Sequence, residues 1–397
     1  HVYWVGAMDW NARDIHGFWC REGTTYNAYL IMAEKITLID TVKKDFYDEL
    51  MSRIASVVDP SRIDIVVSLH AEMDHSGCLP QVMHAVKPSK TYASTVGKET
   101  LSSQFYDPIM ESIIPMEDGS FLDLGNMQLQ FLHTAMMHWP DSMMALLEED
   151  ELLFSQDGFG LHLATSQRFD DELDLATLER YTSAYYANIL LPFAPVVTKG
   201  VTKLKPILAG AKLIAPSHGP CWRTHRDWIV NKYLEWSAQR PTLKAVIVYD
   251  TMWGSVDKMA RAFADGLAQE GVAVKLMRAK DCLRSDIVAE VLTSGGLVVG
   301  SSTLNRGMLP TVADNLHYMK GLRPLNLIGA TFGSFGWGGG ATKQVEKLLK
   351  EMGIPVVVST SSVNYVPDSQ TLEQSHAAGR EFAAALRRHC GLPESKL

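Results

Sequence analysis

The chain has 397 residues, of which 46% are hydrophobic, and 37 basic against 45 acidic side chains give it a formal net charge of −8. This length allows two or three domains with a core each, and the negative charge argues against nucleic acid as a partner. The sequence shows neither a run of about 18 apolar residues nor a secretion signal, so we expect a soluble, cytoplasmic protein that does not engage a membrane.

The first 240 residues predict a mixed α/β domain with antiparallel pieces. Residues 26–31 and 36–40 are typical of paired strands, and residues 44–57 are typical of a helix. Further strand candidates follow at irregular spacing, over residues 63–69, 127–132 and 152–155. This irregular rhythm differs from that of the second half of the chain.

The strand candidate at 63–69 leads directly into a block of four possible metal ligands in the pattern H-x-E-x-D-H. These ligands are His70, Glu72, Asp74 and His75. The composition of the chain predicts about 0.005 such blocks by chance, so the pattern is specific. Four ligand-type side chains so close in sequence can converge only where the backbone turns sharply. We expect Ser76 and Gly77 to form a tight loop that leads into a helix.

Three more ligand-type residues follow apolar, strand-like runs. His138 follows residues 129–137, Asp157 follows the strand candidate at 152–155, and His218 follows residues 213–215. If all three project from the same end of a sheet, they share one site with the H-x-E-x-D-H block. Taken alone, each is more often an ordinary hydrogen-bonded or turn residue, so this inference depends on the block.

Seven ligands exceed what one transition metal needs and predict a two-metal site with one bridging carboxylate. Zinc hydrolases favour neutral imidazole, whereas three carboxylates beside four imidazoles suit iron or manganese, of which we expect iron. The five cysteines include no C-x-x-C pair. Their spacing argues against a disulfide framework, a rubredoxin-like iron site and a cysteine-held zinc module within this chain.

From residue 244 onward, apolar β-rich runs alternate with helical patterns. The expected strands are 245–249, 272–276, 297–300, 327–331 and 355–359, and the expected helices are 257–269, 285–293, 311–319, 341–352 and 372–388. Five such units predict an open, doubly wound parallel sheet. The polar, proline-bearing stretch 239–242 separates the two patterns, so we expect one domain over 1–240 and another over 241–397.

Three polar or glycine-rich loops follow adjacent strands of this second sheet, over residues 250–256, 300–307 and 332–340. Hydroxyls and amides in front of a helix N-terminus bind a terminal phosphate, and the first loop lacks the G-x-G-x-x-G pattern of dinucleotide sites. With two tryptophans, the loops suit a flat aromatic ring that carries a single phosphate. The candidate binding residues are Thr251, Met252, Trp253, Gly254, Ser255, Val256, Ser302, Thr303, Leu304, Asn305, Gly307, Ser334, Phe335, Gly336, Trp337, Gly338 and Gly339.

These motifs resemble those of the flavodiiron proteins, also called rubredoxin:oxygen oxidoreductases. Residues 70–77 resemble the metal loop of the metallo-β-lactamase fold, with Glu72 where hydrolases of that fold carry a histidine. Further matching stretches are 9–11, 23–30, 138–142, 157–160 and 216–219. The second half resembles a flavodoxin domain that holds FMN, although Val256 and Ser302 stand where the family often has a hydroxyl residue and a proline.

The resemblance implies a fold and a set of roles. The fold is an N-terminal metallo-β-lactamase-like αββα sandwich followed by a flavodoxin-like doubly wound parallel sheet. One iron would take His70, Glu72 and His138, the other would take Asp74, His75 and His218, and Asp157 would bridge the two. Trp139 would shape a water-poor pocket over the metals, and no catalytic residue beyond the metal ligands is expected.

The two modules together imply an oxidoreductase. FMN passes electrons one at a time and two ferrous ions deliver two at once, which suits reduction of dioxygen to water or of nitric oxide to nitrous oxide. The electrons must come from another molecule, for which the family suggests a rubredoxin. The family also suggests a head-to-tail homodimer, or a dimer of dimers, in which the FMN of one subunit faces the di-iron centre of the other. Two alternatives stay open: a two-metal hydrolase with a regulatory flavodoxin domain, and a flavodoxin-type electron carrier on an inert scaffold.

Overall fold

The computed structural model describes residues 1–360 and 362–393 and divides into two compact units. The first unit contains His1–Tyr185 and Phe193–Leu234, and the second contains Tyr186–Pro192 and the residues from Glu235 onward. The division therefore falls inside one helix, α7 (Arg226–Ala238). None of the helices in the described ranges combines the length and the apolar character that a membrane crossing requires.

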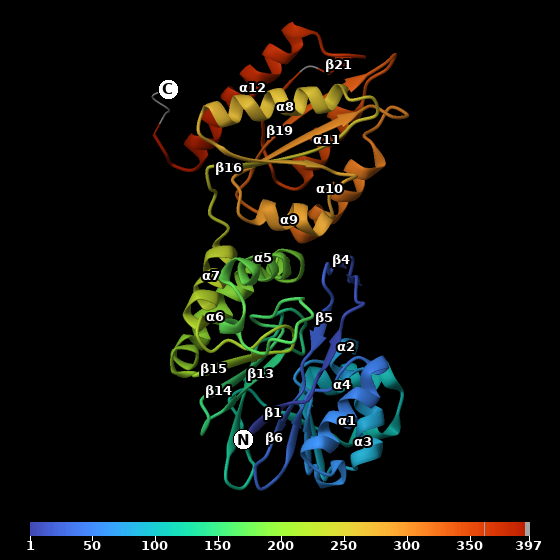
Figure 1. Cartoon of the computed structure of the whole chain (residues 1–397), viewed down its shortest axis with the longest axis vertical. Helices are drawn as coiled ribbons and strands as arrows, with labels where there is room; N and C mark the ends of the chain where they lie inside the picture. The colour runs from blue at the N-terminus through green and yellow to red at the C-terminus, as the bar shows by residue number, and fades with distance from the viewer. Residues whose placement is uncertain (361, 394–397) are drawn as a thin grey trace. The chain divides into compact units, whose positions relative to one another are not determined.

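The first unit is built on two large sheets (Figure 1). The first sheet contains, in spatial order, β1 (Val2–Trp4), β6 (Tyr29–Ile31), β7 (Thr37–Ile39), β8 (Ile65–Val67), β9 (Lys90–Ser94) and β10 (Ile113–Met116). The second contains β11 (Phe121–Asp123), β12 (Gln128–His133), β13 (Met143–Leu147), β14 (Leu152–Gln156) and β15 (Leu213–Pro216). Two small ribbons pair β2 (Ala7–Asp9) with β5 (Thr24–Tyr26) and β3 (Asp14–Ile15) with β4 (Phe18–Trp19).

The first unit also contains helices. They are α1 (Tyr47–Val57), α2 (Met73–Ser76), α3 (Leu79–Val86), α4 (Thr95–Phe105), α5 (Leu175–Tyr185), α6 (Ala194–Gly210) and the first part of α7. Short 3-10 turns lie at Lys44–Phe46, Pro60–Arg62, Pro108–Ser112, Asp170–Glu172 and Leu191–Phe193, and a π turn lies at Tyr186–Leu190. In Figure 1, α1, α3 and α4 (blue to cyan) gather beside the first sheet, and α6 and α7 (green to yellow) gather beside β14 and β15.

Alternate residues of the same strands enter two different cores, as the period-two geometry of a strand requires. The core shared with α1, α3 and α4 takes Leu30, Leu38 and Val66. The core shared with the second sheet takes Ile31, Ile39 and Val67, which pack with residues such as Phe131 and Phe154. The two sheets therefore enclose a common apolar layer, and the predicted metallo-β-lactamase-like sandwich is confirmed.

The predicted strand over 26–31 is wrong in one respect, because it is two strands that break at Asn27. The backbone N–H of Asn27 donates to the carbonyl oxygen of Ser217 at 2.8 Å. Its side-chain amide donates to the carbonyl oxygens of Pro216 (2.7 Å) and Gly219 (2.9 Å). Asn27 thus leaves the sheet ladder in order to fasten the loop that carries His218.

The second unit is a parallel sheet in the order β17-β16-β18-β19-β20, with β21 also beside β19. Its strands are β16 (Lys244–Asp250), β17 (Ala273–Arg278), β18 (Gly296–Ser302), β19 (Ile328–Phe335), β20 (Val356–Ser359) and β21 (Val363–Asn364). Its helices are α8 (Ser255–Gln269), α9 (Arg284–Leu292), α10 (Pro310–Leu322), α11 (Ala341–Glu351) and α12 (Ser369–His389). α8 and α12 share one core with the sheet, and α9, α10 and α11 contact its strands as well (Figure 1). The predicted doubly wound parallel sheet is confirmed.

Candidate metal centre and cofactor loops

The H-x-E-x-D-H block folds as one helical turn directly after the buried strand β8. Asp74 and His75 lie within α2, and Glu72 precedes it in extended backbone. The hydroxyl of Ser76 donates back to the carbonyl oxygens of Ala71 (2.7 Å) and Glu72 (3.0 Å), which closes the turn. All four ligand-type side chains consequently face the same region above the end of β8.

Position 77 requires glycine for a different reason than the sequence predicts. Gly77 is right-handed helical (φ −56°, ψ −29°), so it does not form the tight loop that we expected. A Cβ atom at Gly77 would lie 2.3 Å from the carbonyl oxygen of Met73 and 2.7 Å from the backbone nitrogen of Lys44. Glycine is needed here because α2 packs directly against the backbone before α1.

The other three predicted ligands come from one edge of the second sheet. β12, β14 and β15 all run in the same direction, because β13 is antiparallel to both β12 and β14 and β15 is parallel to β14. Asp157 directly follows β14, and His218 follows β15 by two residues. His138 does not follow its strand directly as expected, since β12 ends at His133. It lies on a loop closed by a hydrogen bond from the N–H of Thr134 to the carbonyl oxygen of Ser142 (3.0 Å).

The structure brings all seven predicted ligands together as two groups. One group is His70, Glu72, His138 and Asp157, and the other is Asp74, His75 and His218. Asp157 touches both groups. Its Oδ2 lies 3.2 Å from Nε2 of His138 and 3.5 Å from Nε2 of His70. Its Oδ1 lies 3.2 Å from Nε2 of His75 and 3.4 Å from Nε2 of His218.

Several of these ligand atoms are buried without a conventional partner. Among the described residues, Oδ1 of Asp74, Nε2 of His75 and Oδ1 of Asp157 are buried and make no hydrogen bond. Oδ1 of Asp74 nevertheless lies only 3.3 Å from Nε2 of His75. Unpaired buried polar atoms are costly, and a cation shared by these carboxylate and imidazole atoms would satisfy them together. This is the donor pattern of a metal site.

Burial and charge act in opposite directions on the pKa values in this cluster, and charge prevails. Burial alone would raise the pKa of Asp157, but the facing imidazoles, first that of His75, hold it well below its usual range. Burial alone would lower the pKa of His70, but hydrogen bonds with Asp141 and Glu72 raise it to about 10. In the same way, carboxylates raise the pKa values of His75 and His138 to about 9. The carboxylates are therefore ionised, and the metal-free imidazoles of His70, His75 and His138 retain protons at neutral pH.

A further layer of residues, which the sequence did not single out, holds these ligands. Nδ1 of His70 lies 3.0 Å from Oδ2 of Asp141, and Nδ1 of His218 donates to the carbonyl oxygen of Thr25 at 2.6 Å. These contacts direct the Nε2 atoms toward the cluster. The β3-β4 ribbon contributes His16, whose Nε2 lies 2.6 Å from Oε1 of Glu72.

Aromatic rings border the cluster. The indole of Trp139 stands perpendicular to the ring of His70, with 5.2 Å between ring centres, and lies 6.2 Å from that of His138. The buried imidazole of His162 packs on His218 with ring centres 4.7 Å apart, and Thr24 hydrogen bonds to it at 2.7 Å. Burial, together with the nearby His218, lowers the pKa of His162 well below its usual value, so this imidazole is neutral.

In the second unit, the three predicted loops meet at the carboxyl edge of β16, β18 and β19. The hydroxyl of Ser302 lies between the other two loops, 3.4 Å from the N–H of Met252 and 3.3 Å from the hydroxyl of Ser334. The N–H of Thr303 donates to the carbonyl oxygen of Ser334 at 2.8 Å. Ser302 thus links three loops, a contact that a proline could not make.

The first loop ends at the N-terminus of α8. Oγ1 of Thr251 accepts from the N–H groups of Gly254 (3.1 Å) and Val256 (3.3 Å). The side chain of Val256 is completely buried in the core, so Val256 offers this loop only its backbone. Trp253 and Trp337 are 94% and 97% exposed, which leaves two large aromatic surfaces free beside the loops.

One loop residue was missed by sequence reasoning. Tyr365 donates its N–H to the carbonyl oxygen of Phe335 (2.7 Å), and its own carbonyl oxygen accepts from the hydroxyl of Ser255 (2.7 Å). Its ring lies 3.3 Å from the position of a Cβ on Gly336, and its side chain is 60% exposed. Tyr365 therefore belongs to the same loop cluster. The only sequence signal was an aromatic residue in a turn after the last strand.

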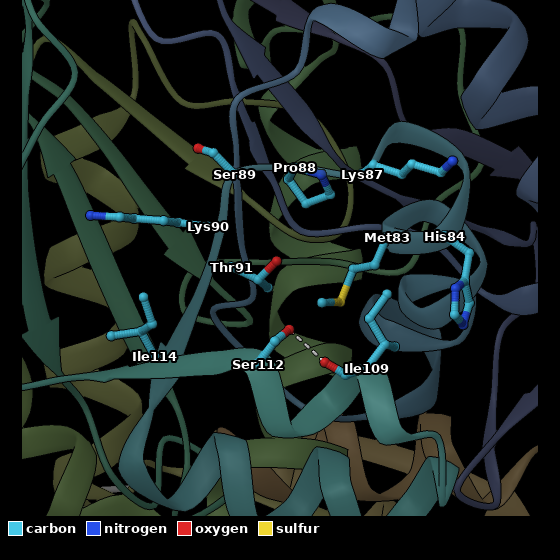
Figure 2. Close-up of a pocket in the computed structure, with 10 residues that line it drawn as sticks. All are labelled: Met83, His84, Lys87, Pro88, Ser89, Lys90, Thr91, Ile109, Ser112 and Ile114. Carbon is cyan, nitrogen blue, oxygen red and sulfur yellow. Dashed lines mark hydrogen bonds between the residues drawn. The ribbon is translucent and has the colours of Figure 1, made fainter.

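A pocket of about 310 Å³ lies elsewhere in the first unit, between α3 and the strands β9 and β10 (Figure 2). Its lining includes His84, Lys87 and Lys90 but none of the seven metal-ligand candidates. Figure 2 shows the side chains of Lys87 and Lys90 pointing in opposite directions rather than into the pocket. The basic groups do not converge on a ligand, so this pocket is not a candidate for the active site.

Comparisons with known proteins agree with both units. Residues 24–219 match the family described as ODP family beta lactamase, and residues 247–379 match the flavodoxin family. The chain is 43% identical over 386 residues to the rubredoxin-oxygen oxidoreductase of Megalodesulfovibrio gigas, with 96% of each chain covered. It is 40% identical over 388 residues to the nitric oxide reductase of Moorella thermoacetica, with 97% of each chain covered.

Solved structures resemble this one over almost its whole length. The rubredoxin oxygen:oxidoreductase from Desulfovibrio gigas superposes with a TM-score of 0.93 at 42% identity and covers 98% of this chain and 97% of its own. The flavodiiron protein from Giardia intestinalis superposes with a TM-score of 0.92 at 31% identity and covers 99% and 97%. These structures share both units, in the same order, over almost the whole length of the chain. This chain belongs to the flavodiiron protein family.

Proposed function

We propose that this flavodiiron oxidoreductase reduces dioxygen to water, nitric oxide to nitrous oxide, or both, with electrons that reach a di-iron site through FMN. The observation that carries the proposal is the convergence of seven metal-ligand candidates as two groups joined by Asp157. Relatives named rubredoxin-oxygen oxidoreductase and nitric oxide reductase support both substrates. Three carboxylates favour iron over the zinc of hydrolases of this fold, since they neutralise the charge that would activate water.

The ligand assignment follows the two groups. One iron would be held by His70, Glu72 and His138 and the other by Asp74, His75 and His218, and Asp157, which contacts both groups, would serve both irons. The buried atoms that make no hydrogen bond, on Asp74, His75 and Asp157, are the ones that a pair of cations would satisfy. When bound, the irons supply electrons and open positions for a small molecule.

The chain itself provides geometry and a dry surrounding. Asp141 and the carbonyl oxygen of Thr25 fix the imidazoles of His70 and His218 with Nε2 toward the metals. Trp139 covers the ring of His70, and the side chains of Asp157 and His218 are each only 2% exposed. A site with so little water access limits the loss of partly reduced products.

FMN binds at the loop cluster of the second unit in this proposal. The hydroxyl of Thr251 and the amides that begin α8 would hold the phosphate, and Trp253 and Trp337 would flank the flat ring. The two exposed indoles and the absence of a dinucleotide pattern support a mononucleotide. We assign the metal module to residues 1–240 and the FMN module to residues 241–397, with residues 186–192 and 235–240 of the metal module belonging to the second compact unit.

The partners follow from the family. An external donor, a rubredoxin, delivers electrons to FMN, and two chains associate head to tail, singly or as a dimer of dimers, so that the FMN of one serves the metals of the other. The five cysteines form no disulfide and no C-x-x-C pair, which supports an external donor. We place the protein in the cytoplasm.

The test begins with protein loaded with iron and FMN, reduced without oxygen and then given dioxygen or nitric oxide in parallel. We expect rapid gas consumption at an electrode, with iron and flavin reoxidised together, and the ratio of the two rates identifies the preferred gas. His138→Asn should lose consumption of both gases, whereas His84→Asn, whose exposed imidazole pairs with Asp107, should not. If the loaded wild type consumes neither gas, the proposal is wrong and a hydrolase or carrier function takes its place.

A further inference from the structure

Gln156 makes an unusual contact with the proposed bridging ligand. Its side chain is 1% exposed, and Nε2 donates to Oδ2 of the neighbouring Asp157. Its own Oε1 is buried without a hydrogen-bond partner among the described residues. Burying Oε1 without a partner costs free energy. The contact of Nε2 with Asp157 is therefore what the position of this amide provides.

The backbone is shaped to allow this contact. Gln156 adopts φ +55°, a left-handed conformation that non-glycine residues seldom take. The pairing of β14 with β15 shifts register between Phe154 and Gln156. The carbonyl oxygen of Gln156 then accepts from the N–H of Ser217 at 2.8 Å, in the loop that carries His218. Bulges of this kind commonly redirect a side chain beside an active site.

The hydrogen bond divides the two oxygens of Asp157. Oδ2, which Gln156 holds, faces Nε2 of His138 and of His70. Oδ1, which has no hydrogen bond with any residue that the structure describes, faces Nε2 of His75 and of His218. A carboxylate that can rotate freely could chelate a single metal through both oxygens. A carboxylate with one oxygen held presents one oxygen to each group.

We propose that Gln156 is a positioning residue that keeps Asp157 in the bridging orientation and thereby secures the second metal ion. This inference rests on the proposed di-iron site. Without the amide, Asp157 would turn toward one group, the first metal would keep its ligands, and the second would lose one. Substituting residues that hold metal ligands typically costs 10–100-fold in affinity.

The test is an anaerobic Fe(II) titration of metal-free protein against a chromophoric chelator. For Gln156→Met, which keeps the size but removes the donor, we expect the first equivalent to bind as in the wild type and the second to bind about 10–100-fold more weakly. The one-electron-oxidised protein should also lose the electron paramagnetic resonance signal of a coupled iron pair. A merely structural role would weaken both equivalents alike and leave the coupling of bound pairs intact.

Gln239→Met is the matched control. Gln239 is also buried and left-handed (φ +44°) and accepts from the N–H of Leu325. Its own Nε2 has no partner within residues 1–360 and 362–393, but Gln239 lies in the second unit. It should bind both equivalents normally. Normal binding of the second equivalent by Gln156→Met, with the coupled signal retained, overturns the inference.

A measurement on the unaltered protein covers the case in which Gln156→Met does not fold. With ¹⁵N-glutamine labelling and Zn²⁺ as a diamagnetic probe, one side-chain amide should resist deuterium exchange and shift with the second equivalent. If no glutamine amide responds to Zn²⁺, the inference is wrong. If the wild type binds two irons but consumes neither gas, the proposed function fails while the role of Gln156 stands. If it binds fewer than two irons, both fail.

Discussion

Oδ2 of Asp141 lies 3.0 Å from Nδ1 of His70 and accepts the N–H of Ala71 at 2.6 Å, so a single carboxylate oxygen fixes the ring of one proposed iron ligand and the backbone of the residue that follows it. A carboxylate behind a histidine orients the ring and makes Nε2 a stronger donor. We therefore expect Asp141→Ala to lower iron affinity by about 10–100-fold, and Asp141→Asn, which retains an acceptor, to lower it less. Anaerobic iron titration measures both.

The exposed pair of His84 and Asp107 offers a control for Asp141. Nε2 of His84 lies 3.0 Å from Oδ2 of Asp107, the same distance as in the buried pair. Asp107→Asn should leave the iron content unchanged, because this pair lies away from the seven ligands. Equal iron affinity in Asp141→Ala and the wild type would show that the buried contact has no influence on the metal.

The proposed metal ligands could be predicted because they cluster in the sequence or follow strands. The H-x-E-x-D-H block places four ligand-type residues within six positions, and Asp157 and His218 follow strands of clearly apolar sequence. His16 and Gln156 carry no such signal. Each is a solitary polar residue, and only the tertiary fold brings it to a ligand carboxylate.

The fold likewise has parts that the sequence predicts and parts that it does not. The second unit alternates strands with helices, and its predicted strands and helices agree with the observed ones to within a few residues. In the first unit, the sequence did not predict β9 (Lys90–Ser94) or β13 (Met143–Leu147). β9 mixes polar and apolar residues without a clear alternation, and β13 is rich in methionine and leucine, which favour helices. Their strand structure comes from neighbours in the sheet.

Close packing at Gly77 leads to a prediction about stability. Gly77→Ala would place a Cβ atom 2.3 Å from the carbonyl oxygen of Met73, so α2 or the backbone at Lys44 must shift. We expect a loss of about 1–3 kcal/mol in the free energy of unfolding, together with a lower iron content, because α2 carries Asp74 and His75. Chemical denaturation and metal analysis measure the two effects.

Gly210→Ala serves as its partner experiment. Gly210 is the last residue of α6, and a Cβ atom there would meet no described residue within 4 Å. Alanine should be neutral or stabilise the protein by up to about 1 kcal/mol. If Gly77→Ala were as stable and as rich in iron as Gly210→Ala, the contact between α2 and Lys44 would not constrain the metal loop.

The exposed tryptophans lead to a prediction for FMN. An indole that is 97% exposed gains buried contact area only when a ligand covers it, so Trp337→Ala should weaken FMN binding about tenfold and leave iron binding unchanged. Titration of the FMN-free protein, followed by quenching of flavin fluorescence, measures the affinity. Tyr106→Ala, which removes an 88% exposed aromatic residue from the first unit, should have no effect. Unchanged affinity in both Trp337→Ala and Trp253→Ala would place the flavin elsewhere.

Proton release should accompany metal binding. In the metal-free cluster, the pKa values of His70, His75 and His138 are raised to about 10, 9 and 9, so at pH 7 these imidazoles carry protons. A metal needs the Nε2 lone pair, and each proton on that atom must leave before the imidazole can bind. Iron affinity should therefore rise as the pH increases from 6 to 8 and fall as the pH decreases.

The release can be counted in weakly buffered solution with a pH indicator while Zn²⁺ or Fe(II) is added to metal-free protein at pH 7. We expect protons to appear with each equivalent, since His70 and His138 belong to one group and His75 to the other. His138→Asn should release fewer protons with one equivalent than the wild type does, whereas His84→Asn should match the wild type, because its imidazole is exposed and distant from the ligands. Metal binding without proton release, at an affinity independent of pH, would contradict this prediction. It would mean that the buried imidazoles are already neutral before the metal binds and that the carboxylates beside them do not raise their pKa values.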